Sequence, residues 1–120
     1  LRRWELEAKE WKIATQLRDV LQVFYQATQF FSREGDEAPA LTDVIPSMDI
    51  IDQRLATDSI NRDLDPAVRV AVGMAKQTIN RYYSKSDESA AYRIAMILDP
   101  RYKLQYFHDH DWTDEWIAQA

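Results

Sequence analysis

Apolar side chains recur at steps of three and four residues along most of the chain, a spacing that places them on one face of an α-helix. The first such run extends from Trp4 to Phe31 and predicts one long helix. At ~1.5 Å per residue this helix would reach roughly 42 Å, more than a compact domain needs, so its first turns are expected to project or to pack on other protein. Its expected core-facing stripe consists of Trp11, Ala14, Leu17, Leu21, Phe24, Thr28 and Phe31.

Turn-forming residues separate this helix from two further ones. Gly35 can adopt a left-handed conformation and Pro39 cannot continue a helix, so a loop is expected over 32–39. Thr42-Asp43 then offers a capping residue, with Pro46 inside the first turn, where proline is tolerated. Asp65-Pro66 predicts the start of a third helix, antiparallel to the second and ending near Tyr83. The expected stripes are Val44, Met48, Ile51 and Leu55 in the second helix, and Val68, Val72, Ala75, Ile79 and Tyr82 in the third.

Gly73 lies inside the third helix, at a cost of ~1 kcal/mol relative to alanine, which suggests that another backbone packs closely against it. The next break is expected at Ser84-Lys85-Ser86, followed by a cap at Asp87 or Ser89. A fourth helix with a small-faced inward stripe then follows. That stripe consists of Ala90, Ala91, Ile94, Ala95 and Leu98.

The segment Leu98-Asp99-Pro100-Arg101-Tyr102-Lys103 predicts a corner that organises the end of the chain. Asp99 can cap a new helix by accepting amide hydrogens of its first turn, and Pro100 has the φ that such a turn needs. A short helix with aromatic side chains should follow, then a linker over 108–111 and a last turn capped by Thr113. The side chains expected to be buried there are Tyr102, Leu104, Tyr106, Phe107, Trp116 and Ile117.

Composition supports this all-α interpretation. The 120 residues fit a single domain, 1–120, and two glycines with four prolines are too few for a loop-rich β protein. We therefore predict an antiparallel bundle of about five to six helices. No apolar run approaches the ~20 residues of a membrane span, so no membrane partner is expected. A start at Leu1 within a helical charge pattern suggests a fragment of a larger protein, and the absence of cysteine excludes disulfides and thiolate zinc sites.

Charge is unevenly distributed. The net charge of −5 argues against a free-standing nucleic-acid module, because such modules concentrate positive charge against phosphates. Residues 32–65 hold three basic and nine acidic side chains, whereas residues 76–103 hold six basic and three acidic ones. Two explanations of this uneven charge are open. Solvated helix faces can differ in charge by chance, or the acidic part docks a basic partner and the basic part contacts DNA.

Three kinds of chemistry have candidate residues. Lys76, Arg81, Arg101 and Lys103 could contact DNA phosphates. The carboxylates and imidazoles of 108–111 could bind a metal, but neighbours in one loop rarely converge on an ion, so no metal ligand and no catalytic residue is assigned. The aromatic rings are expected mainly in the core, with base stacking as the alternative, and exposure of Tyr102, Tyr106 and Phe107 would cause self-association. The rings considered for stacking are Trp4, Trp11, Trp112, Trp116, Tyr82, Tyr83, Tyr102 and Tyr106.

Several short segments, in this order, resemble the helical region of hAT superfamily transposases of the plant and fungal BED-finger type. The distinctive one is Leu98-Asp99-Pro100-Arg101-Tyr102-Lys103, preceded by Ala95-Met96-Ile97. The resemblance covers roughly residues 10–107. The other matching segments are Glu10-Trp11, Leu21 with Phe24, Thr28 with Phe31-Ser32, Val44-Ile45-Pro46, and Lys76 with Tyr82-Tyr83.

This resemblance implies a helical insertion within an RNase H-like fold, whose three catalytic carboxylates, BED finger and dimerisation region lie outside the matching segments. It implies that this fragment binds no cofactor and that the intact transposase uses magnesium. The implied partners are DNA and the remaining regions of the same chain, and the implied location is the nucleus. Asp99 is assigned a capping role, and Trp11 is the candidate counterpart of a tryptophan near the cleaved DNA end. Leu98, Pro100 and Tyr102 complete the structural motif.

The expected function is therefore that of a non-catalytic helical subdomain that supports DNA binding and transposition by the intact protein. The alternative is a structural or protein-interaction bundle without DNA contact.

Overall fold

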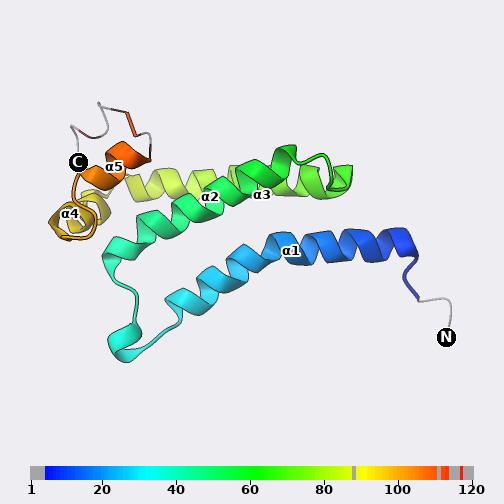
Figure 1. The fold of residues 1–120 in the computed structure, drawn as a ribbon, viewed down its shortest axis with the longest axis horizontal. Coiled ribbons are helices and arrows are strands. Elements are labelled where there is room, and N and C mark those ends of the chain that lie inside the picture. Colours follow the sequence, from blue (N-terminus) through cyan, green and yellow to red (C-terminus); the bar gives the residue numbers. More distant parts are fainter. Residues whose placement is uncertain (1–4, 88, 111, 114–116, 118–120) are drawn as a thin grey trace.

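The computed structural model describes residues 5–87, 89–110, 112–113 and 117, and these residues form helices and turns without a β-strand (Figure 1). The prediction of an all-α bundle is confirmed. In chain order the elements are α1 (Ala8–Phe31), the 3₁₀ turns η2 (Gly35–Glu37) and η3 (Leu41–Asp43), α2 (Val44–Ile60), α3 (Pro66–Asp87), α4 (Ala90–Leu98) and α5 (Gln105–Asp109).

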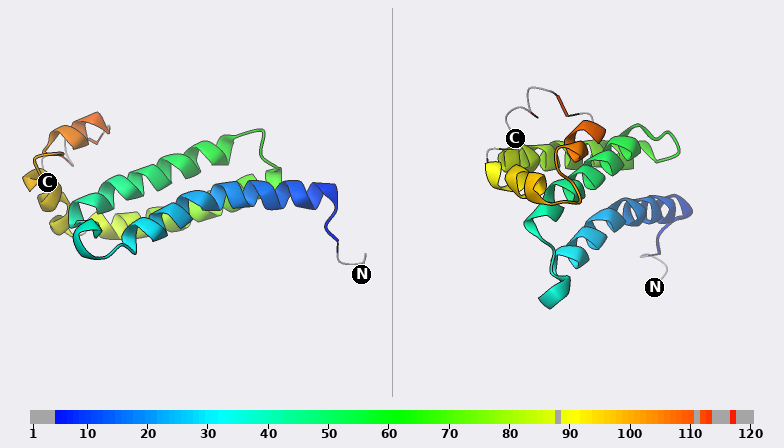
Figure 2. Two further views of the ribbon diagram at one scale, coloured as in Figure 1. Left: turned by 60° about the horizontal axis from the view of Figure 1, so that its bottom comes forward. Right: turned by 60° about the vertical axis from the view of Figure 1, so that its left-hand side comes forward.

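Helices α2 and α3 form the expected antiparallel hairpin, and the two lie side by side in every view (Figure 2). Asp65 begins α3 as predicted, because its Oδ1 accepts a hydrogen bond from the Ala67 amide at 2.9 Å. Two of the stripe residues of each helix, Ile51 and Leu55 from α2 and Val68 and Val72 from α3, are buried against each other in one cluster. This cluster is the first of two hydrophobic cores.

Helix α1 is tied to the hairpin through one amide side chain. Gln16 donates from Nε2 to the Asp63 carbonyl at 3.1 Å and accepts at Oε1 from the Asp65 amide at 2.8 Å. The helix begins at Ala8, later than predicted, where the Glu10 carboxylate accepts the Glu7 amide hydrogen at 2.8 Å. The predicted start, Trp4, lies outside the described residues.

The predicted core face of α1 is wrong. Val20 is only 4% exposed and joins the first core, whereas Leu21, the next residue, is 51% exposed. A second stripe on the same helix packs inward, and Phe24 belongs to both stripes. The inward stripe consists of Ile13, Val20, Val23, Phe24 and Ala27, and the exposed side chains of the predicted stripe include Trp11, Leu17, Leu21 and Phe31.

The second core lies at the other end of the hairpin, where α4 and α5 cover the start of α2 (Figure 1). Its buried centre is Ile45, Met96 and Phe107. The inward face of α4 therefore carries Met96 rather than the predicted stripe, and Leu98 is 76% exposed. Larger side chains pack around this centre, and the partly buried ones are Tyr92, Ile97, Tyr102, Tyr106, Trp112 and Ile117.

Two predictions about α3 are also wrong. The helix continues through Ser84-Lys85-Ser86 to Asp87. Gly73 has no close neighbour, since nothing lies within 4 Å of the position that a Cβ would take.

Two local predictions outside α3 are confirmed. Gly35 adopts the expected left-handed conformation, with φ 66°. At the next helix start, Ser89 is the N-cap, and its Oγ accepts the Ala91 amide hydrogen at 3.4 Å.

The corner after α4 turns the chain but does not start a helix at Pro100. Lys103 has φ 53°, a left-handed conformation that stops helix growth, and α5 begins only at Gln105. The Lys103 amide donates back to the Met96 carbonyl at 3.1 Å and to the Asp99 carbonyl at 3.2 Å. These bonds satisfy carbonyl groups at the end of α4, so the segment is a helix stop followed by a turn.

The molecule is more extended than a compact domain of its length. Its Cα radius of gyration is 18.0 Å, against the ~14 Å that 120 residues give in a compact domain. Figure 1 shows the reason: α1 and α2 spread apart toward η2 and η3, which join their ends. Part of the apolar surface of α1 is therefore not covered by the rest of the described chain.

Candidate functional site

Arg101 is the centre of the corner that the sequence singled out. The Asp99 carboxylate accepts the Arg101 amide hydrogen at 2.9 Å and a guanidinium hydrogen at 2.8 Å. The same guanidinium donates to the Thr42 hydroxyl at 3.2 Å and lies 3.7 Å from the Asp43 carboxylate. It also lies over the Tyr102 ring, 5.1 Å from the centroid. Arg101 thus joins the turn after α4 to the turn before α2.

The electrostatics of this corner follow from the contacts. The Arg101 side chain, and then its backbone amide, donate hydrogen bonds that lower the pKa of Asp99 to about 2. The same Asp99 carboxylate raises the pKa of Arg101. Both groups are therefore charged at neutral pH. Asp99 keeps the capping type of hydrogen bond that was predicted, but the bond holds a turn and a guanidinium rather than a helix.

The four cations predicted to contact DNA do not form one group. Lys76 makes an ion pair with Asp52 across the α2–α3 hairpin, and Arg101 is held as described. Arg81 and Lys103 are exposed and make no ion pair with any of the described residues. Arg81 lies about 140° further around α3 than Lys76, so these two cations do not share one face of the helix. Of the four predicted cations, Lys76 and Arg101 are neutralised within the fold by their ion pairs.

Asp49 is a polar centre that the sequence analysis did not identify. Its Oδ1 accepts the hydroxyl hydrogen of Tyr83 at 2.6 Å, and its Oδ2 accepts that of Tyr106 at 2.6 Å. One carboxylate thus joins α2, α3 and α5. Burial, and then the hydrogen bond to Asp49, raise the pKa of Tyr106 above its ordinary range.

A cleft of about 350 Å³, the α1–α2 cleft, lies between α1 and the first half of α2. Its polar groups include Asp43 at one end, and the ring of Tyr102 also lines it. The cleft therefore adjoins the Arg101 corner. Its apolar walls are formed by Val23, Ala27 and Phe30 from α1 and by Pro46, Ile50 and Ile51 from α2.

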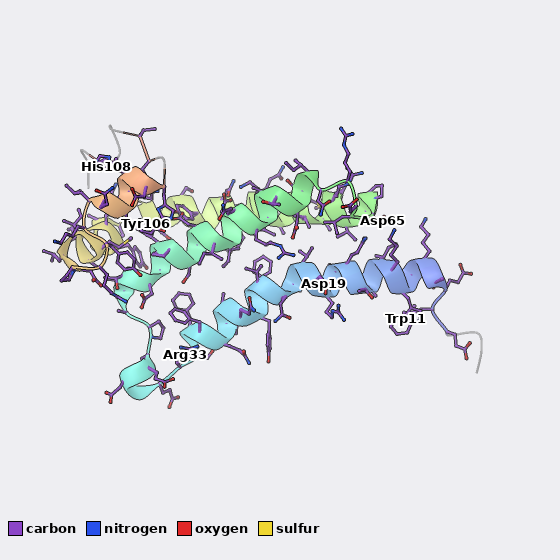
Figure 3. All side chains as sticks on the ribbon, viewed as in Figure 1. Trp11, Asp19, Arg33, Asp65, Tyr106 and His108 are labelled. Atoms are coloured by element: carbon purple, nitrogen blue, oxygen red, sulfur yellow. The ribbon has the colours of Figure 1, made fainter. Side chains whose placement is uncertain are left out.

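The exposed aromatic side chains are not the ones predicted to cause self-association. Phe107 is fully buried, and Tyr102 and Tyr106 are half-buried in the second core. Trp11, by contrast, is 60% exposed and projects from α1 on the side away from α2 (Figure 3). Tyr25 is exposed on the same helix, beside a shallow groove lined by Ala14, Leu17 and Leu21. Helix α1 thus has uncovered apolar surface, and α3 exposes Val70, Met74 and Tyr82 as well.

The remaining predicted features have limited chemistry. His110 stacks on the Tyr106 ring with centroids 4.0 Å apart, and Asp111 lies outside the described residues. Within the described ranges, no three acidic or histidine side chains come together to hold a metal ion. In the same part of the chain, no helix has the length and apolar character needed to cross a membrane. Trp116 lies outside the described residues, while Ile117 packs on the second core.

Two contributing residues, Gln16 and Asp49, were missed in the sequence, and Thr42 was considered only as a cap and not as a partner of Arg101. Only Asp49 carried a signal, because it follows the buried Ile45 by four residues on α2 and is thus a polar residue on an inward face. The partners of Gln16 and Thr42 are 47 and 59 residues away in sequence, and no local pattern identifies them.

Comparison with known protein families, with curated proteins and with solved structures finds no match for this chain.

Proposed function

We propose that this chain is a non-catalytic helical subdomain of a hAT-type DNA transposase or of a transposase-derived protein. Its role is to support DNA binding and transposition by the intact nuclear protein, in which magnesium serves the RNase H-like part. The proposal is supported by the order of the resembling segments in the sequence. The observation that carries it is the Arg101 corner: the most distinctive of those segments joins α4 to the start of α2.

In this proposal the DNA backbone is contacted by Arg81 and Lys103. Both are exposed, and neither charge is paired with an acid of the described chain. Lys76 and Arg101 serve the fold instead, because their partners Asp52 and Asp99 already satisfy them. Two free cations predict weak binding that depends strongly on salt.

The test is fluorescence anisotropy with labelled duplex and single-stranded DNA, from low to physiological salt. The variant is Arg81→Ala/Lys103→Ala, and the matched control is Lys12→Ala/Arg62→Ala, which removes the same charge from exposed sites elsewhere that have no ion pair with the described residues. We expect binding that weakens with salt and a salt slope that falls by about 1 for each lost contact in the first variant only. Equal loss in both variants, or no binding at low salt, would contradict a DNA contact at these two residues.

The second candidate function is protein interaction without DNA contact. The observation that favours it is the uncovered apolar surface of α1, where Trp11 and Leu21 are more than half exposed. A helical scaffold inside a larger protein would cover that surface with its neighbours. Absence of DNA binding, together with association that does not respond to salt, would favour this candidate over the first.

A further inference from the structure

The α1–α2 cleft has the form of a groove that receives a helix. On α1, the side chains that line it are Val23, Gln26, Ala27 and Phe30, which follow the spacing of one continuous helix face. On α2, Ile50 lies at the lip and is 62% exposed. Grooves between two helices bind amphipathic helices, whose apolar side chains at i, i+3, i+4 and i+7 enter the apolar floor.

The sequence of the α1 wall is unusual for an exposed helix. Residues 20–32 contain no charged side chain, although Gln26 and Phe30, which line the cleft in this range, are exposed and partly exposed. Charged residues are depleted and aromatic residues enriched at the centres of protein interfaces. This half of α1 therefore has the composition of a surface that another protein covers.

The charge near the cleft is acidic. Asp43 lines one end of it, and the loop that closes the same end carries Glu34, Asp36 and Glu37. The cations at this end are Arg33, over the Phe30 ring, the exposed Lys103 next to the cleft-lining Tyr102, and Arg101. The Asp99 carboxylate binds Arg101, whose guanidinium also lies 3.7 Å from Asp43, so the acids still outnumber the cations. A second copy of the chain is a poor occupant because its net charge is also −5 and the two acidic ends would repel each other.

We propose that the α1–α2 cleft binds an amphipathic helix of a partner protein that carries lysine or arginine beside its apolar stripe. Its apolar side chains contact Ala27, Phe30 and Ile50, and its cations lie near Glu34 and Glu37. The proposed contacts with the partner helix use other side chains than the proposed DNA contacts, because Arg81 and Lys103 do not line the cleft.

The test measures binding of a fluorescein-labelled helical peptide with leucine at i, i+3, i+4 and i+7 and lysine at its other positions. The matched peptides have the same composition in scrambled order, or glutamate in place of lysine. The cleft variants are Ile50→Ser and Glu34→Gln/Glu37→Gln. Their controls are Leu21→Ser, on the outer face of α1, and Glu5→Gln/Asp63→Asn, which removes the same charge far from the cleft.

We expect the basic helical peptide to bind, and each cleft variant to weaken binding about fivefold or more while its control has little effect. Circular dichroism must show the same helix content in all variants, which separates lost binding from lost folding. Three results would overturn the proposal. The first is that Leu21→Ser weakens peptide binding as much as Ile50→Ser does, and the second is that the glutamate peptide binds as tightly as the lysine peptide. The third is that the chain forms a dimer that does not bind the peptide and that Ile50→Ser abolishes.

Discussion

The Tyr106 hydroxyl donates a 2.6 Å hydrogen bond to the Asp49 carboxylate from 57 residues further along the chain. Asp49 accepts a second hydroxyl hydrogen bond from Tyr83, so α5 is attached to the α2–α3 hairpin through one partly buried acceptor. Next to Tyr106 in sequence, Phe107 is fully buried in the second hydrophobic core. The position of α5 therefore depends on the hydrogen bond to Asp49 and on the packing of Phe107.

Removal of the Tyr106 hydroxyl should loosen that attachment. We expect Tyr106→Phe to lower the free energy of unfolding by on the order of 1.5 kcal/mol, because the lost bond is to a charged acceptor. Urea unfolding followed by circular dichroism measures the effect. The control is Tyr82→Phe, since Tyr82 is exposed. Equal stability of the two variants would show that the Asp49 contact contributes nothing.

The same contact should be visible in the titration of tyrosine. Burial and Asp49 raise the pKa of Tyr106, so its hydroxyl should stay protonated at a pH that ionises exposed tyrosines. A raised pKa gives a stabilising contribution that is complete below the unfolded value of ~10 and is lost as the pH rises above it. Absorbance at the tyrosinate band, followed to about pH 11, should therefore be unchanged by Tyr106→Phe. A reduction of that absorbance in Tyr106→Phe would contradict the shift.

Asp99 should titrate in the opposite direction. Its pKa is lowered to about 2 by Arg101, so its contribution to stability is complete above the unfolded value of ~3.9 and is lost as the pH falls through about 2. Carboxyl carbon resonances report the midpoint directly. We expect Arg101→Gln to move it upward, toward the ordinary value of 3.8, and Arg54→Gln, which removes a different ion pair, to leave it unchanged. A wild-type midpoint near the ordinary value would show that the corner is open in solution.

The two glycines should respond to alanine in opposite ways. Gly73 has a helical position with open space around it, so Gly73→Ala should raise the free energy of unfolding by about 0.5–1 kcal/mol. Gly35 has φ 66°, so Gly35→Ala should lower it by about 1 kcal/mol or more. Thermal unfolding of both variants measures the difference. If Gly73→Ala lowers the free energy of unfolding, this would indicate the close backbone contact at Gly73 that the sequence suggested.

The fold class and most helix boundaries could be predicted because they depend on local signals. Asp65-Pro66 begins α3 as expected, and the hairpin of α2 and α3 follows from the short connection between them. The same Asp-Pro pair at Asp99 gives a turn instead, because Lys103 adopts a left-handed conformation that no sequence rule indicated. Local signals are thus reliable only where tertiary contacts do not override them.

The inward faces of α1 and α4 could not be predicted for a different reason. Each helix carries two overlapping apolar stripes, and periodicity alone does not choose between Val20 and Leu21, or between Met96 and Leu98. Long-range contacts decide the matter: Gln16 fixes the rotation of α1 against the α2–α3 loop, and Ile45 with Phe107 fixes that of α4. The Arg101 corner was singled out from the sequence, but the roles of Asp49 and Thr42 were missed for the same reason, since both gain their partners only in the folded chain.

The orientation of α1 is the claim on which the uncovered apolar surface and the α1–α2 cleft both depend. Its most direct test is the free energy of unfolding of Val20→Ala and Leu21→Ala, two neighbouring residues about 100° apart around the helix, one buried and one exposed. We predict a loss of about 1–3 kcal/mol for Val20→Ala, whose side chain is buried, and a change within about 0.5 kcal/mol for Leu21→Ala. The reverse order would place the Leu21 face in the core and contradict the account.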